Sequence, residues 1–140
     1  MAIADQRELP VAKRIVVKVG SSSISAERAS QITQLVSALA AAHARGSEIV
    51  LVSSGAIATG MPLLNLESKP DDLATSQALA SVGQSRLIAR YQLELEGFQI
   101  VAGQVLFTTA DLEGTETKAN AQAAINRLLE LKVLPIVNEN

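Results

Sequence analysis

Short apolar runs alternate along the chain with stretches of helical periodicity. Four runs are rich in β-branched and other apolar residues, as buried strands are, and they span residues 13–19, 48–52, 98–107 and 133–137. Between them apolar side chains recur at i, i+3, i+4 and i+7, which predicts helices that bury one face; the first such stripe is Ile32, Leu35, Val36 and Leu39. The order β-α-β-α-α-β-α-β is typical of an α/β fold, and we predict a three-layer αβα sandwich with a mainly parallel sheet.

Two long helices are expected in the second half of the pattern. Residues 71–96 form the first, with acidic residues at its start and an apolar stripe that runs from Leu73 to Leu95. Gly83, in the middle of this helix, indicates close backbone packing, either against the sheet or at a dimer contact. Residues 115–132 form the other helix, with Thr115 as its cap. Residues 61–70 contain two prolines and no clear period, which predicts a loop.

Three of the predicted strands end in a lysine, in small turn-forming residues or in an asparagine. Lys18 lies near the end of the first strand, and the residues that follow the strands are Gly20, Ser21, Ser54, Gly55, Ala56 and Asn138. Because the carboxyl ends of parallel strands meet at one edge of a sheet, these residues should lie together. Backbone N–H groups, hydroxyls and a lysine suit an anion, most simply a phosphate. The alternative is an ordinary strand-to-helix turn with a lysine snorkelling from its end.

Composition narrows the class of protein. The 140 residues suit one domain, and with 48% apolar but only 2% aromatic residues the core must be built from Ala, Val, Leu and Ile. A net charge of −2 and no basic block argue against a nucleic-acid partner. No apolar run reaches the roughly 18 residues of a membrane helix. Residues 1–12 do not form a signal peptide, so we expect a disordered leader, a domain from residue 13 to 140 and a cytoplasmic location.

The inventory of reactive groups excludes several chemistries. The chain has one histidine and no cysteine, which leaves little for a thiol nucleophile or a metal site, and we expect no residue of the chain to be a metal ligand. The Walker, GxGxxG, HExxH and GxSxG motifs are absent from the sequence. A lysine, serines and backbone N–H groups remain, and these suit phosphoryl transfer, in which the protein mainly positions groups and neutralises charge.

Four segments, in order and spacing, resemble the amino acid kinase family and within it the glutamate 5-kinases. They read VVKVGSS at 16–22, VSSGAIA at 52–58, ASVGQSRLI at 80–88 and LPIVNEN at 134–140. The resemblance implies phosphorylation of the γ-carboxylate of L-glutamate by ATP and Mg²⁺ to give γ-glutamyl phosphate, the first step of proline synthesis. It also implies a homo-oligomer and feedback inhibition by proline, with the segment 61–70 as the substrate and feedback loop.

The same resemblance implies roles for individual residues. Lys18 matches the catalytic lysine that contacts the transferring phosphoryl group. Together with Gly20 and Ser21, it would bind the ATP phosphates. The glutamate-binding positions of the family fall on Ser54, Gly55, Ala56 and Asn138.

The resemblance covers the chain from residue 13 onward but not the whole pattern of the family. The 140 residues do not include the aspartate that follows Asn-Glu-Asn in the family, nor its nucleotide-binding segments. We therefore expect the substrate-binding part of a kinase, with little turnover by this chain alone. The alternatives are a non-catalytic module that binds glutamate or proline, half of a split kinase, or a kinase of the same family with another acyl acceptor.

Overall fold

The computed structural model describes residues 13–20, 29–107 and 109–138, and within these four strands form one parallel sheet. The strands are β1 (Arg14–Val19), β2 (Glu48–Ser53), β3 (Ala102–Val105) and β4 (Leu134–Asn138), in the order β1-β2-β4-β3. The predicted α/β fold with a parallel sheet is confirmed. The predicted leader, residues 1–12, lies outside the described residues.

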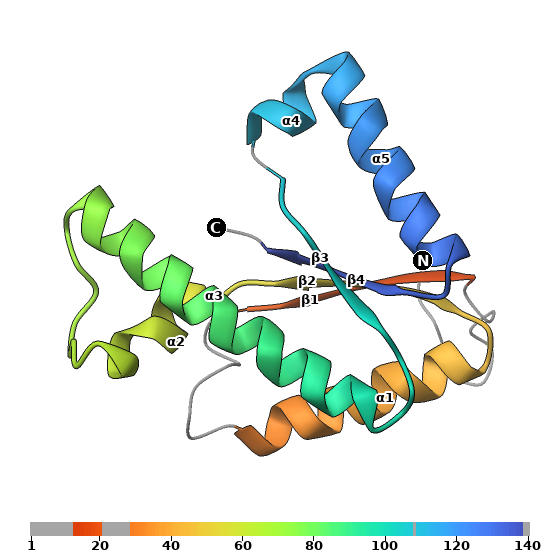
Figure 1. The fold of residues 1–140 in the computed structure, drawn as a ribbon, viewed down its shortest axis with the longest axis horizontal. Coiled ribbons are helices and arrows are strands. Elements are labelled where there is room, and N and C mark those ends of the chain that lie inside the picture. Colours follow the sequence, from red (N-terminus) through yellow and green to blue (C-terminus); the bar gives the residue numbers. More distant parts are fainter. Residues whose placement is uncertain (1–12, 21–28, 108, 139–140) are drawn as a thin grey trace, which may run out of the picture.

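Helices cover both faces of the sheet (Figure 1). On one face lie α1 (Ala29–Ala44) and α3 (Leu73–Glu96), and on the other lie α4 (Thr109–Glu113) and α5 (Thr115–Glu130). Alternate strand residues such as Ile49, Leu51 and Ile136 enter the core under α1 and α3. Helix α5 does not cover β1, where Val16 is 63% exposed. The three layers predicted from the alternating pattern are therefore present, with β1 open on the α5 face.

Helix α2 (Ala56–Leu63) lies beyond the end of β2 and packs against the first part of α3. The predicted loop 61–70 is thus wrong at its start, because α2 continues to Leu63 despite Pro62. The predicted apolar stripe of α3 is also wrong at its start, since Leu73 is exposed and the buried stripe begins at Leu79. The first turns of α3 project past the sheet and meet α2 instead.

Two further boundaries differ from the prediction. The third strand is shorter than the run 98–107 because only Ala102–Val105 pairs with β4. Helix α4 was not predicted, and its short sequence has no periodic apolar stripe. The cap of α5 is Gly114 rather than Thr115, which is already the first helical residue.

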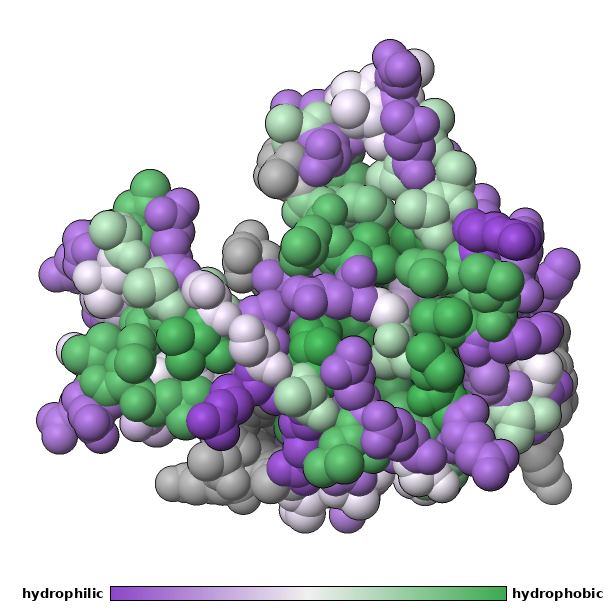
Figure 2. All heavy atoms as spheres, in the orientation of Figure 1, coloured by the Kyte–Doolittle hydropathy of each residue, from purple (hydrophilic) through white to green (hydrophobic). Residues whose placement is uncertain are grey.

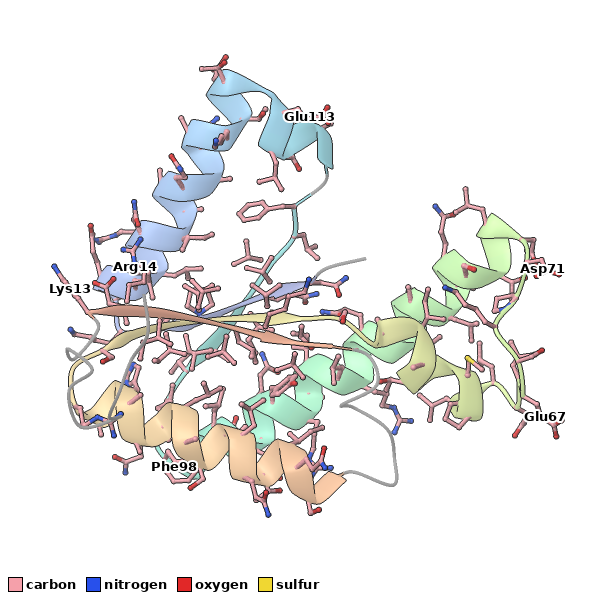
Figure 3. All side chains as sticks on the ribbon, turned by 180° about the vertical axis from the view of Figure 1, so that it is seen from behind. Lys13, Arg14, Glu67, Asp71, Phe98 and Glu113 are labelled. Atoms are coloured by element: carbon pink, nitrogen blue, oxygen red, sulfur yellow. The ribbon has the colours of Figure 1, made fainter. Side chains whose placement is uncertain are left out.

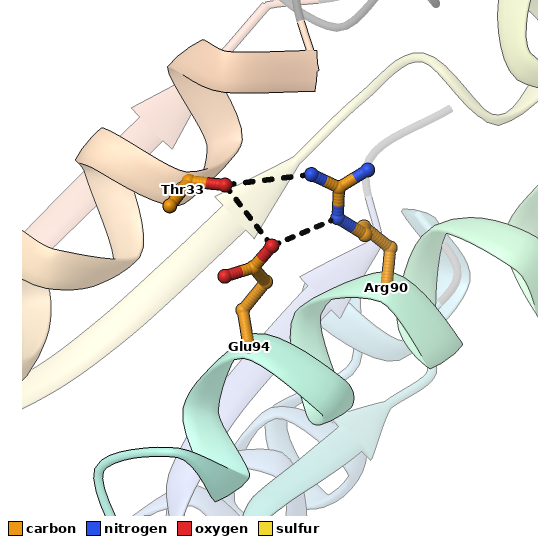
Figure 4. A network of polar contacts seen from close by, with 3 residues as sticks. All are labelled: Thr33, Arg90 and Glu94. Carbon is orange, nitrogen blue, oxygen red and sulfur yellow. Dashed lines mark hydrogen bonds and ion pairs between the residues drawn. The ribbon is translucent and has the colours of Figure 1, made fainter.

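Polar contacts join α1 to α3 on the outside of the core (Figure 4). The Thr33 hydroxyl donates to Glu94 Oε1 at 3.0 Å, and Arg90 Nε donates to the same oxygen at 3.1 Å. Arg90 Nη2 reaches the Thr33 hydroxyl at 3.5 Å. One carboxylate oxygen therefore links α1 to α3 outside the core. No helix in the described part of the chain is both long and apolar enough to cross a membrane.

Asp72 caps α3, as the sequence predicts for its acidic start. Its carboxylate accepts hydrogen bonds from the Thr75 hydroxyl at 2.7 Å and the Thr75 backbone N–H at 2.8 Å. These bonds, the side-chain bond first, lower the pKa of Asp72. A carboxyl whose pKa is lowered on folding stabilises the protein above its ordinary pKa of 3.8, and this stabilisation is lost as the pH falls through the lowered value.

Asp72→Ala is therefore expected to lower the midpoint of thermal unfolding at neutral pH. The difference from wild type should shrink as the pH falls below the ordinary pKa of 3.8. Thermal melts by circular dichroism across that range measure it. Asp71→Ala, which removes the same charge from the preceding residue, is the control, and an equal effect of both variants would contradict a capping role.

Candidate functional site

The carboxyl ends of β1, β2 and β4 meet at one edge of the sheet. In the pairing register Val19 lies opposite Ser53, and Ser53 lies opposite Asn138. Figure 3 shows Lys13 and Arg14 at the opposite end of the sheet, whereas Glu67 and Asp71 lie beyond α2, on the side of this edge. The structure thus brings together the strand ends that the sequence singled out.

Ser54 ties the end of β2 to the end of β1. Its backbone N–H donates to the Val19 carbonyl oxygen at 3.0 Å, and its hydroxyl donates to the same oxygen at 3.2 Å. The two polar turns predicted separately, one after Val19 and one after Ser53, are therefore connected directly. With its proton directed at Val19, the Ser54 hydroxyl presents lone pairs rather than a donor to the surrounding space.

Gly55 and the start of α2 form an anion-binding geometry. Gly55 has a φ of 110°, a left-handed conformation that favours glycine, and no side chain caps the helix at this point. The first intrahelical bond joins the Thr59 N–H to the Gly55 carbonyl at 2.9 Å. The N–H groups of the first turn, beginning at Ala56, therefore have no intrahelical acceptor, and the helix dipole adds partial positive charge there.

Lys18 lies near the end of β1, opposite Val52 in the register. Its neighbours Val17 and Val19 face the core, so alternation directs Lys18 to the other face, where α5 leaves β1 uncovered. Gly20 follows the strand, and a methyl group added there would meet no atom within 4 Å. Ser21 lies outside the described residues, so its predicted contact with phosphates stays a prediction.

Beneath this edge the structure holds buried polar groups that sequence reasoning missed, apart from Asn138. The Gln84 side chain, only 8% exposed as a residue, has neither its Oε1 nor its Nε2 hydrogen-bonded. The Tyr91 hydroxyl and Asn138 Oδ1 are also buried without a hydrogen-bond partner. Gln84 and Tyr91 lie two turns apart on the core face of α3. The sequence signal that could have indicated this group is Gln84, a polar residue within an otherwise apolar helical stripe.

Tyr91 is a fully buried aromatic residue in this core. Burial raises the pKa of its hydroxyl, and the neighbouring Ser53 side chain opposes that rise only in part, because the two groups do not reach hydrogen-bonding geometry. The Ser53 hydroxyl instead donates to the Ser54 carbonyl at 3.4 Å. Tyr91 therefore stays a neutral phenol at physiological pH.

Gln84→Met is expected to raise the free energy of unfolding by about 1–3 kcal/mol, because it removes two unpartnered polar atoms and keeps the side-chain length. Urea denaturation followed by circular dichroism measures the change. Gln92→Met, at an exposed position of the same helix, is the matched control and should have little effect. A less stable Gln84→Met protein would show that the carboxamide has partners in solution.

Among the hollows lined by described residues, two of the larger ones lie beside the sheet and outside the turn at Ser54. One, of about 260 Å³, is bounded by β1, α1 and α3 and includes Lys18 and Tyr91 in its lining. The other, of about 310 Å³, lies between the end of β3 and helices α4 and α5. Figure 2 shows apolar side chains gathered beneath α5 on the visible face. Neither of these hollows includes the Ser54–Ala56 turn or Asn138 in its lining.

No group of three or more His, Cys, Asp or Glu residues in the described ranges could hold a metal ion. Lys18, near the end of β1, and the amino terminus of α2 both contribute positive charge at this edge of the sheet. Such a site suits two negatively charged reactants held side by side.

Comparisons with known proteins relate the chain to one family of kinases. Residues 13–140 match the model of the amino acid kinase family. A protein of Clavibacter sepedonicus named glutamate 5-kinase is 62% identical over 140 residues, which are the whole of this chain and 54% of that protein. Its namesake in Thermobifida fusca is 48% identical over 137 residues, or 95% of this chain and 35% of that protein. The chain spans about half the length of the Clavibacter relative.

Solved structures share the fold at low sequence identity. An isopentenyl phosphate kinase structure superposes with a TM-score of 0.59 at 16% identity, covering 91% of this chain and 57% of the other. A product complex of the isopentenyl phosphate kinase of T. acidophilum gives a TM-score of 0.57 at 12% identity, covering 87% of this chain and 53% of the other. With the family match over residues 13–140, these findings show that the chain belongs to the amino acid kinase family.

Proposed function

We propose that the whole protein transfers the γ-phosphoryl group of ATP to the γ-carboxylate of L-glutamate, giving γ-glutamyl phosphate and ADP. The single observation that carries the proposal is the pair of bonds from Ser54 to the Val19 carbonyl, which joins the lysine-bearing strand end to the turn before α2. Similarity to proteins named glutamate 5-kinase supports the choice of acceptor. The chain would supply the acceptor side of the reaction.

The reaction needs charge neutralisation more than proton transfer. A carboxylate oxygen of glutamate forms the new bond to the γ-phosphorus while the bond from that phosphorus to the bridging oxygen of ADP breaks. Glutamate is already ionised at neutral pH, so no base is required. The Lys18 ammonium would offset charge between the two oxyanions, and Gly20 and Ser21 would leave room for the phosphates. Mg²⁺ bound to ATP would supply further neutralisation.

Glutamate would be held at the turn before α2. The N–H groups that begin at Ala56 would bind a carboxylate, and the left-handed Gly55 forms the turn that leads from β2 into them. Asn138 would donate through its amide nitrogen Nδ2 to the same ligand, while its Oδ1, buried without a partner, is available only as an acceptor. Inhibition by proline and self-association stay predictions of the family resemblance.

Calorimetry and a coupled ADP assay test the proposal. The 140-residue chain should bind L-glutamate, and D-glutamate serves as the control ligand. A chimera in which these 140 residues replace the matching segment of the Clavibacter sepedonicus relative should turn over ATP only when glutamate is present. Binding without turnover in the chimera would favour the non-catalytic module. The absence of both glutamate binding and ATP turnover would refute the proposed substrate.

A further inference from the structure

Helices α2 and α3 cross with a buried glycine on each side, Gly60 on α2 and Gly83 on α3. A methyl group added at Gly83 would overlap the Ala56 carbonyl oxygen and lie 2.7 Å from its carbon and 2.8 Å from the Gly60 nitrogen. One added at Gly60 would overlap the Leu79 carbonyl oxygen and lie 3.3 Å from the Gly83 nitrogen. The two backbones are thus in direct contact. The close packing predicted for Gly83 is present, but against α2 rather than the sheet.

The contact falls on the candidate site itself. Ala56, whose carbonyl group meets Gly83, is the first residue of α2 and directly follows the Ser54–Gly55 turn. On the other side of the turn, Ser54 is fixed by its two bonds to the Val19 carbonyl. The turn is therefore held at both ends, by β1 through hydrogen bonds and by α3 through backbone contact, with the left-handed Gly55 between them.

A side chain at either glycine would push the helices apart. Protein interiors are close-packed, so the backbone of a short helix must move when a methyl group has no space. Glycine in a helix interior costs about 1 kcal/mol relative to alanine, which α3 accepts at Gly83. In return, the close contact fixes the amino end of α2, where the N–H groups without an intrahelical acceptor lie.

We propose that Gly83 is a positioning residue for the acceptor carboxylate, acting through its contact with Ala56. The inference rests on the proposed function, because it takes the turn before α2 as the place where the carboxylate binds. Helix α3 would then affect substrate affinity indirectly, because Gly83 has no side chain that could contact a ligand. A displacement of α2 by a fraction of an ångström would move the N–H donors away from their acceptor.

Gly83→Ala tests this role against Gly97→Ala. Gly97 ends the same helix with a φ of −59°, and a methyl group there would meet only the Glu94 carbonyl oxygen at an ordinary 3.4 Å. In the 140-residue chain, Gly83→Ala should raise the dissociation constant for L-glutamate by about fivefold or more. It should also speed hydrogen exchange of the Ser54 and Thr59 amides while strand amides keep their protection. Gly97→Ala should change neither quantity.

Kinetics in the chimera separate positioning from a general loss of structure. Gly83→Ala should raise KM for glutamate and leave KM for ATP unchanged, whereas equal changes in both would contradict the proposal. Unchanged glutamate affinity together with unchanged exchange at Ser54 and Thr59 would also overturn it. If wild type binds no glutamate, the proposed function fails, and the exchange data still decide whether Gly83 holds the turn.

If Gly83→Ala does not fold, a second variant tests the same contact. Gly60→Ala places its methyl group against Leu79 rather than Ala56 and is read by the same measurements. If both variants fail to fold, the proposal is wrong, because the crossing would then be needed by the whole domain and not by the turn.

Discussion

Lys18→Ala is expected to lower kcat of the chimera by about 10²–10³-fold, while the dissociation constant of glutamate stays unchanged. Removing one preorganised group that stabilises developing charge typically has an effect of this size. Lys18 is exposed on β1, and its assigned contact is with the transferring phosphoryl group rather than with glutamate itself, so binding of the acceptor before the reaction should not depend on it. The coupled ADP assay and calorimetry measure the two quantities.

Lys13→Ala is the matched control for this prediction. Figure 3 shows Lys13 at the opposite end of β1, so its removal changes the net charge equally without reaching the site. Lys18→Arg should recover only part of the rate, because a guanidinium is larger and carries its charge in a plane. Turnover close to wild type in Lys18→Ala would refute the assigned role, and weakened glutamate binding would place Lys18 in the acceptor pocket instead.

The ends of β1 and β2 illustrate what the sequence predicts well. Each apolar run stops directly at glycine or serine, so strand, turn and edge follow from local pattern alone. The parallel arrangement of the strands then places Ser53 opposite Asn138 without any knowledge of side-chain contacts. Local pattern and topology are sufficient to predict where these strands end and that their ends share one edge, because neither feature depends on side chains elsewhere in the chain.

Helix α2 could not be predicted from the local sequence pattern. Pro62 suggests a helix break, yet it lies in the last turn of a short helix, where only one hydrogen bond is lost. The helix is stabilised by its crossing with α3, and sequence alone indicates a close approach at Gly83 but not its partner. The unpartnered atoms of Gln84 and Tyr91 depend in the same way on which segments surround them.

Gly55→Ala is expected to lower the free energy of unfolding by about 1–3 kcal/mol, because alanine is strained at a φ of 110°. It should also weaken glutamate binding by about tenfold or more, since relaxing the strain rotates the N–H groups of the first turn of α2 away from the ligand. Urea denaturation gives the first quantity and calorimetry the second, both on the 140-residue chain.

Gly46→Ala separates the two effects. Gly46 has a φ of 95° in the turn between α1 and β2, at the opposite end of the sheet, and a methyl group there would meet no atom within 4 Å. It should therefore show a comparable loss of stability with unchanged glutamate affinity. If both variants weaken binding equally, the effect comes from global destabilisation. If Gly55→Ala binds glutamate like wild type, the left-handed turn does not aim the helix donors, and the acceptor site must lie elsewhere along the edge.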